Sequence, residues 1–245
     1  MFFFNKNRTH LKDLIPDNYV DIHSHLLYGI DDGAQTPEDT LYLISGLQKL
    51  GIKQFVTTPH IIQYVWENTT KTINNRHEDV QKLLAENESI VPIKAAAEYL
   101  MDEHFVELFQ TNQLLTLKDN YVLVEMSYIN APIQLYNILF DLQVAGYKPL
   151  LAHPERYQFL HNNYNEYTKL KKAGCEFQLN LLSLVGYYGE GVFETAKKLL
   201  KDGFITYTGT DTHHKKHLQA YDNLVKIKDL KPIQEALQNN QFFKF

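Results

Sequence analysis

Cysteine and long apolar runs are the features this 245-residue chain has least of. Its single cysteine, Cys175, cannot form an internal disulfide, which is typical of a reducing compartment. The N-terminal apolar run covers only residues 2–4, whereas a signal peptide needs about 7–15 apolar residues and a membrane-spanning helix about 20. We therefore expect a cytoplasmic protein that is not embedded in a membrane.

Positive charge is also scarce. The 24 lysines and arginines are outnumbered by 29 aspartates and glutamates, so the formal net charge is −5. A wide nucleic-acid surface needs a basic excess, so we expect no nucleic-acid partner, and an anionic substrate must be attracted by a local site. The chain has no Walker-type phosphate loop, and GEGVFE at 189–194 does not fit the dinucleotide-binding pattern.

No linker or low-complexity segment interrupts the chain, so we expect one domain over residues 1–245. An N-terminal extension (1–18) and C-terminal helices (215–245) would flank an alternation of apolar β-type runs and amphipathic stretches. The predicted strands cover 19–25, 53–60, 92–100, 121–128, 148–156, 176–184 and 204–214. Helical patterns cover 37–51, 75–86, 132–146 and 192–203. The first of these helices starts with the cap residue Thr36 followed by Pro37.

The polar residues of the predicted strands point to a closed barrel. Seven βα units in series predict parallel strands covered by helices. Six of the strands carry histidine or carboxylate at or near their carboxyl ends: His23, His25, His60, Glu98, Glu125, His153, Asp211 and His213. In a (β/α) barrel these ends meet at one face, where the active site lies. We therefore predict an α/β fold, a distorted (β/α)7 TIM-like barrel, whose N-terminal extension either covers the opposite end or mediates assembly.

Two pairs of these residues have the spacing of shared ligands. His23 and His25, and likewise Asp211 and His213, are two positions apart, so each pair points to one face of a strand. A lone H-x-H pair is more often two surface histidines, but four other strand ends carry similar groups. Imidazole and carboxylate without thiolate suit Mn, Fe or Zn in a cluster better than a zinc–thiolate structural site. The sequence therefore predicts a cluster of metal ions.

Five stretches in order resemble the motifs of the PHP (polymerase and histidinol phosphatase) superfamily: DIHSH (21–25), TTPH (57–60), AAAEYL (95–100), AHPER (152–156) and GTDTHH (209–214). Residues 21–41 are more narrowly similar to the start of the metal-dependent protein-tyrosine phosphatases of bacterial capsule and exopolysaccharide loci. The resemblance extends from about Asp21 to His213. It implies the PHP type of barrel, holding three divalent metal ions, with manganese favoured and iron or zinc as alternatives.

The resemblance also implies which residues hold each ion. The first ion would be held by His23, His25, Glu98 and Asp211. The second would be held by Glu98, Glu125 and His153. The third would be held by Asp32, His60 and His213. His60 and His213 are also candidate catalytic residues, Asp31 is a neighbour of the ligand Asp32, and Asp21 would orient a histidine.

Arg156 and Lys216 are the candidate phosphate-binding residues. Arg156 follows His153 by three positions and would hold a phosphate with its guanidinium fork; the alternative is a salt bridge to Glu155 or a contact with a helix end. The family often has a further arginine after the last D-x-H motif, where this chain has HHKKH (213–217), so Lys216 or Lys215 would replace it as a point charge. His214 and His217 would either donate a proton to the leaving group or lie in a solvated loop.

The resemblance implies a hydrolase of phosphoric monoesters, specifically a protein-tyrosine phosphatase. Three divalent ions would outweigh the four carboxylates of the site and leave a local charge of +2 for a phosphate. A cysteine mechanism is excluded, because it needs an arginine six positions after the cysteine and Leu181 stands there. Tyr28, Tyr64, Trp66 and Tyr99 are candidates to stack on a phosphotyrosine ring, although packing is the commoner role of each.

The resemblance implies a phosphotyrosine protein as partner, namely a membrane-associated tyrosine autokinase of polysaccharide export. A small-molecule phosphoesterase of the histidinol-phosphatase kind is the first alternative. An inactive PHP-type binding module is the second, although all nine matched ligand positions are retained. Oligomerisation is compatible with the sequence but is not encoded in any motif.

Overall fold

The computed structural model of the chain describes residues 9–245. The strands of this part are β1 (Tyr19–Asp21), β2 (Ile52–Thr57), β3 (His60–Ile61), β4 (Ile93–Ala95), β5 (Glu98–Leu100), β6 (Tyr121–Glu125), β7 (Lys148–Ala152), β8 (Glu176–Asn180) and β9 (Tyr207–Gly209). Its α-helices are α1 (Pro37–Lys49), α2 (Thr70–Glu86), α3 (Glu103–Gln110), α4 (Leu135–Val144), α5 (Gln158–His161), α6 (Asn165–Lys172), α7 (Glu190–Lys201), α8 (Lys215–Ala220) and α9 (Lys231–Asn239). Short 3₁₀ helices are η1 (Leu11–Leu14), η2 (Pro154–Arg156), η3 (Leu181–Val185) and η4 (Asn240–Phe243).

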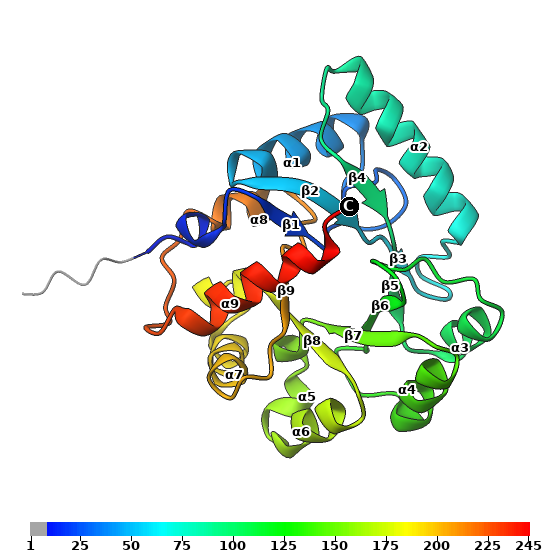
Figure 1. Cartoon of the computed structure of the whole chain (residues 1–245), viewed down its shortest axis with the longest axis vertical. Helices are drawn as coiled ribbons and strands as arrows, with labels where there is room; N and C mark the ends of the chain where they lie inside the picture. Colours follow the sequence, from blue (N-terminus) through cyan, green and yellow to red (C-terminus); the bar gives the residue numbers. More distant parts are fainter. Residues whose placement is uncertain (1–8) are drawn as a thin grey trace, which may run out of the picture.

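The strands form two sheets in which every described neighbouring pair is parallel. Their orders are β1-β2-β4 and β3-β5-β6-β7-β8-β9. Figure 1 shows the strands around a common centre with the helices on the outside. Because helices cover the outward faces, the strands are apolar on both sides; Tyr121–Glu125, for example, is buried throughout. The predicted class, a mixed α/β protein with parallel strands, is confirmed.

Two of the seven predicted strands are each divided into two short ones. The run 53–60 divides into β2 and β3 at Thr58 and Pro59, and the run 92–100 divides into β4 and β5 at 96–97. After both breaks the chain resumes in the second sheet, where His60 lies directly beside Glu98 in the β3–β5 register. The breaks therefore bring these two side chains together on neighbouring strands.

The first strand ends earlier than predicted, and the reason is a buried carboxylate. Asp21 accepts hydrogen bonds from the backbone N–H groups of His23 (3.4 Å) and Thr210 (3.0 Å), so these groups do not enter a regular ladder. Beyond β1 and β9 the two segments stay side by side through an isolated parallel bridge between Ser24 and Thr212. His23 and Asp211 are thus held in irregular backbone between two strand ends.

The amino ends of the strands are closed by the C-terminal segment. Phe243 is fully buried and packs edge-on against Tyr121 and Tyr207, the first residues of β6 and β9. Asn240 is also fully buried and bridges the gap between β1 and β9 with its side-chain amide, donating to Val20 O (2.9 Å) and Thr208 O (2.8 Å). Figure 1 shows α9 and the C-terminus lying across the centre of the strand array.

The predicted C-terminal helices are present as α8, α9 and η4. Within the N-terminal extension, η1 contacts the segment after α8: Leu11 and Lys12 donate backbone hydrogen bonds to Asn223 O and Tyr221 O, each at 3.0 Å. The two roles predicted for the extension stay predictions. Residues 1–8, including the phenylalanines of the apolar run, lie outside the described residues.

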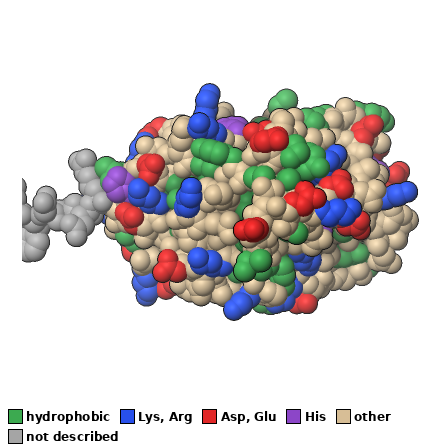
Figure 2. Space-filling model, turned by 90° about the horizontal axis from the view of Figure 1, so that it is seen from above, with side chains coloured by type: hydrophobic (Ala, Val, Ile, Leu, Met, Phe, Trp, Pro, Cys, Tyr) green, Lys and Arg blue, Asp and Glu red, His purple; other side chains and the backbone are tan. Residues whose placement is uncertain are grey.

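The predicted start of α1 is confirmed. Thr36 Oγ1 accepts from the backbone N–H of Asp39 (3.2 Å), and the Asp39 carboxylate accepts from the Thr36 N–H (3.1 Å), which forms a capping box. None of the described helices has the length and apolar character needed to cross a bilayer. On the face seen in Figure 2, basic and acidic side chains alternate with apolar ones.

Candidate metal centre

All nine side chains predicted to bind metal meet at the carboxyl ends of the strands. Their ligand atoms form overlapping groups in which all atoms lie within 4.8 Å of one another. The groups are His25, Asp32, His60 and His213; His23, Glu98 and His153; His23, His25 and Asp211; and His60, Glu98 and Glu125. The structure therefore brings together residues that lie up to 190 positions apart in the chain.

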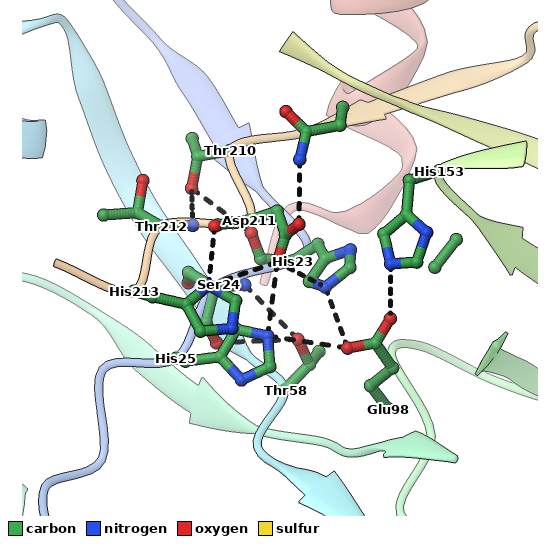
Figure 3. Close-up of polar contacts among 12 residues, drawn as sticks. His23, Ser24, His25, Thr58, Glu98, His153, Thr210, Asp211, Thr212 and His213 are labelled. Carbon is green, nitrogen blue, oxygen red and sulfur yellow. Dashed lines mark hydrogen bonds and ion pairs between the residues drawn. The ribbon is translucent and has the colours of Figure 1, made fainter. Parts of the chain in front are cut away.

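Glu98 directs its two carboxylate oxygens at different histidines of this cluster, as Figure 3 shows for His153 and His23. Its Oε1 is 3.1 Å from His153 Nε2, while its Oε2 is 3.1 Å from His23 Nε2 and 3.3 Å from His60 Nδ1. The two oxygens thus face different histidines. This is the arrangement expected of a carboxylate shared between two ions.

Asp211 faces the two histidines of the H-x-H motif. Its Oδ1 is 3.2 Å from His23 Nε2 and 3.4 Å from His25 Nε2, so the three side chains converge on one point (Figure 3). Both His23 and His25 are completely buried. Because burial of polar groups is costly unless they are partnered, this convergence of two imidazoles and a carboxylate suits a cation.

Asp32 is the outermost member of the cluster. Its carboxylate is 54% exposed and lies 3.5 Å from both His60 Nε2 and His213 Nε2. The side chains of His60 and His213 are 12% and 13% exposed, whereas those of Glu98 and Asp211 are 0% and 2% exposed. The Asp32 group therefore forms the mouth of the site, and the Glu98 group lies beneath it.

The unpartnered atoms of the cluster fit a metal centre. His25 Nε2, His60 Nδ1 and Glu125 Oε1 are buried and have no hydrogen-bond partner in the described structure. His60 Nδ1 and Glu125 Oε1 are nevertheless only 3.0 Å apart. Each of these atoms carries a lone pair that a cation can accept, and the nitrogen and oxygen donors without thiolate suit Mn, Fe or Zn.

The buried histidines and carboxylates of the cluster influence one another's pKa. Burial opposes protonation of His23, but the Glu98 and Asp211 carboxylates outweigh this effect and raise the pKa of His23 to about 10. Burial would likewise raise the pKa of Glu98 and of Asp211, yet the facing His23 holds both pKa values well below their ordinary range. The site thus favours bound positive charge, which in the metal-free protein is supplied by protons.

Two side chains that sequence reasoning did not place correctly orient the histidines. Asp31 Oδ2 is 2.8 Å from His25 Nδ1, so Asp31 orients this ring. Gln178 Oε1 is 2.8 Å from His23 Nδ1. Asp21, which was predicted to orient a histidine, contacts His23 through its backbone N–H (3.4 Å) and also accepts from the Thr210 hydroxyl (2.8 Å). Gln178 gave no sequence signal, since it occupies an ordinary strand position.

Close approaches and strained backbone also shape the site. His153 and Asp211 adopt positive φ angles of 36° and 48°, which cost energy for residues with a β-carbon. A β-carbon at Gly33 would lie 2.4 Å from the β-carbon of His25, and one at Gly209 would lie 2.6 Å from that of His23. Glycine is therefore required beside both histidines of the H-x-H pair.

Arg156 borders the cluster inside an aromatic pocket. Its Nη1 donates to Asp211 Oδ2 at 2.7 Å, so the predicted alternative of a salt bridge to Glu155 is not what forms. Its guanidinium carbon lies 4.8 Å from the Tyr128 ring centroid and 4.3 Å from that of Tyr188. Together with Ile129, Gln158 and Val192, these three residues line a pocket of about 350 Å³.

The aromatic residues of this pocket differ from the predicted ones. Tyr99 is completely buried and accepts a hydrogen bond from the Leu115 N–H, so the prediction that it stacks on a substrate is wrong. Tyr28 stacks on Arg76 at 4.2 Å, and Tyr64 is 84% exposed. Tyr128 and Tyr188 were missed because neither belongs to a recognisable motif; only their contact with Arg156 distinguishes them.

The basic segment after the last motif lies at the start of α8. Lys215 and Lys216 are both exposed, and Lys215 faces the Tyr42 ring at 5.6 Å. His217 is buried, and burial together with His214 and His213 lowers its pKa to about 3. His217 is thus neutral at pH 7, whereas His214 remains exposed. Among residues 9–245, no hydrogen bond or ion pair joins Lys216 to the cluster, and its role stays a prediction.

Cys175 lies far from this chemistry. Its side chain is buried, and burial raises the pKa of the thiol to about 12. A neutral, inaccessible thiol is not a nucleophile. The exclusion of a cysteine mechanism therefore agrees with the structure.

Comparison with known proteins identifies relatives whose sequences align with most of this chain. The family described as capsular polysaccharide synthesis, CpsB/CapC, matches residues 19–225. The tyrosine-protein phosphatase YwqE of Bacillus subtilis is 27% identical over 198 residues, covering 80% of this chain and 78% of YwqE. The tyrosine-protein phosphatase CpsB of Streptococcus pneumoniae is 26% identical over 232 residues, covering 90% of this chain and 96% of CpsB.

Solved structures agree with the sequence relatives. A structure described as that of YwqE and CpsB, unique metal-dependent tyrosine phosphatases, matches with a TM-score of 0.76 and 26% identity, over 82% of this chain and 84% of the other. Histidinol phosphate phosphatase from Lactococcus lactis shares the fold, with a TM-score of 0.51 at 14% identity over 93% of this chain and 94% of the other. Since the family match spans most of its length, this chain belongs to the CpsB/CapC family of capsular polysaccharide synthesis.

Proposed function

We propose that this protein is a metal-dependent protein-tyrosine phosphatase, a hydrolase of phosphoric monoesters. The observation that carries the proposal is the cluster of nine histidine and carboxylate side chains with Arg156 beside it in an aromatic pocket. Its relatives YwqE and CpsB bear the name tyrosine-protein phosphatase, and their structure is described as metal-dependent.

The same proposal extends to the architecture. The two parallel sheets would act as one distorted seven-stranded barrel of the PHP type, in which β2 with β3 and β4 with β5 each count as one strand. The bridge between Ser24 and Thr212 and the amide of Asn240 support closure between the first and last strands. Residues 1–245 would form a single domain.

Three divalent ions, manganese in preference to iron or zinc, would occupy the centre. His23, His25, Glu98 and Asp211 would hold the first ion. Glu98, Glu125 and His153 would hold the second. Asp32, His60 and His213 would hold the third. When bound, such ions supply positive charge for the phosphate and lower the pKa of a water molecule toward about 7.

The protein's own groups complete the chemistry. Arg156 uses one amino group on Asp211 and keeps the rest of its guanidinium fork for phosphate oxygens. Tyr128 and Tyr188 hold the guanidinium in place by stacking and can flank a substrate ring in the same pocket. His60 and His213, the least buried histidines among the nine, would be the catalytic residues nearest the leaving group. Lys216 would attract the substrate as an exposed charge.

The substrate would be a phosphotyrosine protein, and a membrane-associated tyrosine autokinase would be the physiological partner, reached from the cytoplasm. Support comes from the family's description as one of capsular polysaccharide synthesis. The likeness to histidinol phosphate phosphatase concerns the fold alone and gives no reason to prefer a small substrate.

Hydrolysis of three substrates by one sample tests the proposal: a phosphotyrosine peptide, the same peptide with phosphoserine, and histidinol phosphate. The metal content of the sample is measured in parallel. We expect manganese-stimulated turnover of the phosphotyrosine peptide and more than two metal ions per chain. Preference for histidinol phosphate would assign the protein to the small-molecule branch, and bound metal without any turnover would point to a binding module.

A further inference from the structure

Helix α4 presents apolar side chains to solvent as well as to the core. Leu135, Ile138, Leu139 and Leu142 are buried beneath it. On the outside, Ile133 is fully exposed, Phe140 is 66% exposed, Val144 is 71% exposed and Tyr136 is 38% exposed. Tyr136, Phe140 and Val144 are four positions apart and therefore share one face of α4, and Ile133 lies in the turn just before the helix. We call these four residues the α4 stripe.

The α4 stripe is larger than isolated exposed apolar residues would explain. Asp141 is the only charged residue from 132 to 147, so the segment has almost no charge to keep it solvated. Within residues 9–245, α6 reaches the edge of the stripe, where the Tyr136 hydroxyl donates to the Glu166 carboxylate, while Ile133, Phe140 and Val144 stay exposed. Ile133 also borders a groove of about 490 Å³ with Met101 and Val106. A contiguous exposed apolar patch of this kind marks an interaction surface.

The α4 stripe follows, along the chain, residues that line the pocket of Arg156. The loop that follows the candidate ligand Glu125 contains Tyr128 and Ile129 and leads directly into α4. Ile129 is 83% exposed and lines the same pocket as Arg156. Ile133 follows four positions later and borders the groove just before α4. We call Ile129 together with the α4 stripe the apolar track; it begins at the pocket of Arg156.

We propose that this track binds apolar residues flanking the phosphotyrosine of a protein substrate; the inference rests on the proposed phosphatase function. The ten residues of α4 extend over about 15 Å at 1.5 Å per residue, and a peptide in extended conformation covers that length with about five residues at 3.3 Å each. The recognised residues would thus lie within a few positions of the phosphotyrosine.

The charges that line the groove restrict which residues can flank the phosphotyrosine. The groove beside Ile133 is bordered by the carboxylates of Asp102 and Glu103, with no basic side chain among its lining residues. Acidic residues in the flanking segment would be repelled there, while neutral or basic ones would be tolerated. The favoured substrate is therefore a phosphotyrosine segment with aliphatic neighbours and few acidic ones.

A second copy of this chain is the competing occupant of the track. A copy seated along all of it would cover Ile129 at the rim of the pocket that contains Arg156. Such a dimer would obstruct the entry of a phosphoprotein to its own site. Continuity with the pocket therefore favours the substrate over a second copy.

Two synthetic peptides test the inference, both with a central phosphotyrosine, one with leucines and one with serines at two to five positions on either side. Phosphotyrosine amide serves as a substrate without flanks. We expect kcat/KM of the wild-type protein to be about tenfold higher for the leucine peptide. The double variant Ile133→Ser/Phe140→Ser should lose this preference and keep its rate on the amide. Ile90→Ser is the matched control, because Ile90 is 96% exposed but borders a different groove, between α1 and α2.

Each other result overturns the inference. Equal kcat/KM for the two peptides, or an unchanged preference in the double variant, would show that the α4 stripe does not read the substrate. A wild-type dimer that the double variant converts to a monomer, with the preference unchanged, would assign the stripe to a second copy. Hydrolysis of the amide without flank preference leaves the phosphatase function standing, whereas no hydrolysis of any phosphotyrosine substrate refutes both proposals.

Discussion

At the carboxyl ends of the strands the buried side chains are histidines and carboxylates, whereas at the amino ends they are phenylalanine, tyrosine and one asparagine. Asn240 at the amino ends satisfies its whole amide: Oδ1 accepts from the Thr208 N–H at 3.0 Å, and Nδ2 donates to Val20 O and Thr208 O. At the carboxyl ends, His25 Nε2, His60 Nδ1 and Glu125 Oε1 have no hydrogen-bond partner.

The difference shows how one set of strands separates stability from chemistry. Buried polar atoms without partners reduce stability, so they persist where something else, here a set of cations, would compensate them. At the amino ends, the hydrogen-bonded Asn240 amide and the buried Phe243 ring stabilise the fold. The Asn240 amide has no unpaired atom left with which to bind a ligand. Changes at the two ends should therefore have separable effects.

The largest effect is expected from Glu98→Gln, which keeps the shape of the side chain and removes its charge. Because Glu98 faces four histidines, we expect loss of bound metal and a fall in kcat/KM of about 10³-fold or more, with the fold retained. Metal analysis, circular dichroism and turnover of a phosphotyrosine peptide measure this. Glu86→Gln, at an exposed glutamate at the end of α2, is the control. Full metal content in Glu98→Gln would contradict the assigned role.

The reverse pattern is expected from Phe243→Ala at the amino ends. Removing a fully buried aromatic ring should lower the free energy of unfolding by about 3–5 kcal/mol. Metal content and kcat at 25 °C should change little, because the ring lies at the opposite end of the strands. Urea unfolding measures the stability. Phe242→Ala, at a neighbouring residue that is 42% exposed, should lower the free energy of unfolding much less. An equal loss of stability in both variants would contradict this role of Phe243.

Arg156→Lys separates phosphate binding from metal binding at the carboxyl ends. Lysine keeps the charge but loses the planar fork that stacks between Tyr128 and Tyr188. We expect kcat/KM to fall by about 10²-fold while the metal content stays at the wild-type level. Arg76→Lys is a matched control, since Arg76 also stacks on a tyrosine, Tyr28. Wild-type kinetics in Arg156→Lys would exclude the arginine from substrate binding.

The smallest effect concerns pH and distinguishes the metal-free from the metal-loaded protein. The folded-state pKa of His23, about 10, exceeds the usual histidine value of about 6.5. Its contribution to stability is therefore complete below about pH 6.5 and is lost as the pH rises toward 10. We expect the Tm of the metal-free protein to decrease over this range and that of the manganese-loaded protein to change less. Thermal melts with and without a chelator measure both; parallel curves would contradict the prediction.

Much of the fold was predictable because its signals are local. The alternation of apolar runs and amphipathic helices, the Thr36 cap and the C-terminal helices depend on residues close together in the chain. The division of two strands at Thr58–Pro59 and at 96–97 was not predictable. It depends on contacts with other segments, such as the hydrogen bond from the Thr58 N–H to Ser24 O at 2.8 Å.

The candidate site also has parts that were predictable from the sequence and parts that were not. The nine metal-site candidates were selected from the sequence, because spacing of two on a strand and repetition at strand ends are readable without a structure. The sequence did not indicate three other groups: Gln178 beside His23, Tyr188 beside Arg156, and the amide of Asn240 between two strands.

By itself, the sequence determined which side chains are candidates for the metal centre and that parallel strands alternate with helices, because both follow from the order and spacing of residue types. Only the tertiary structure decided which groups orient those side chains, which end of the strands is sealed by the C-terminus, and that α4 keeps an apolar face exposed beside the pocket. These features depend on contacts across as many as 220 positions, such as that of Asn240 with Val20, which only the packed chain brings together.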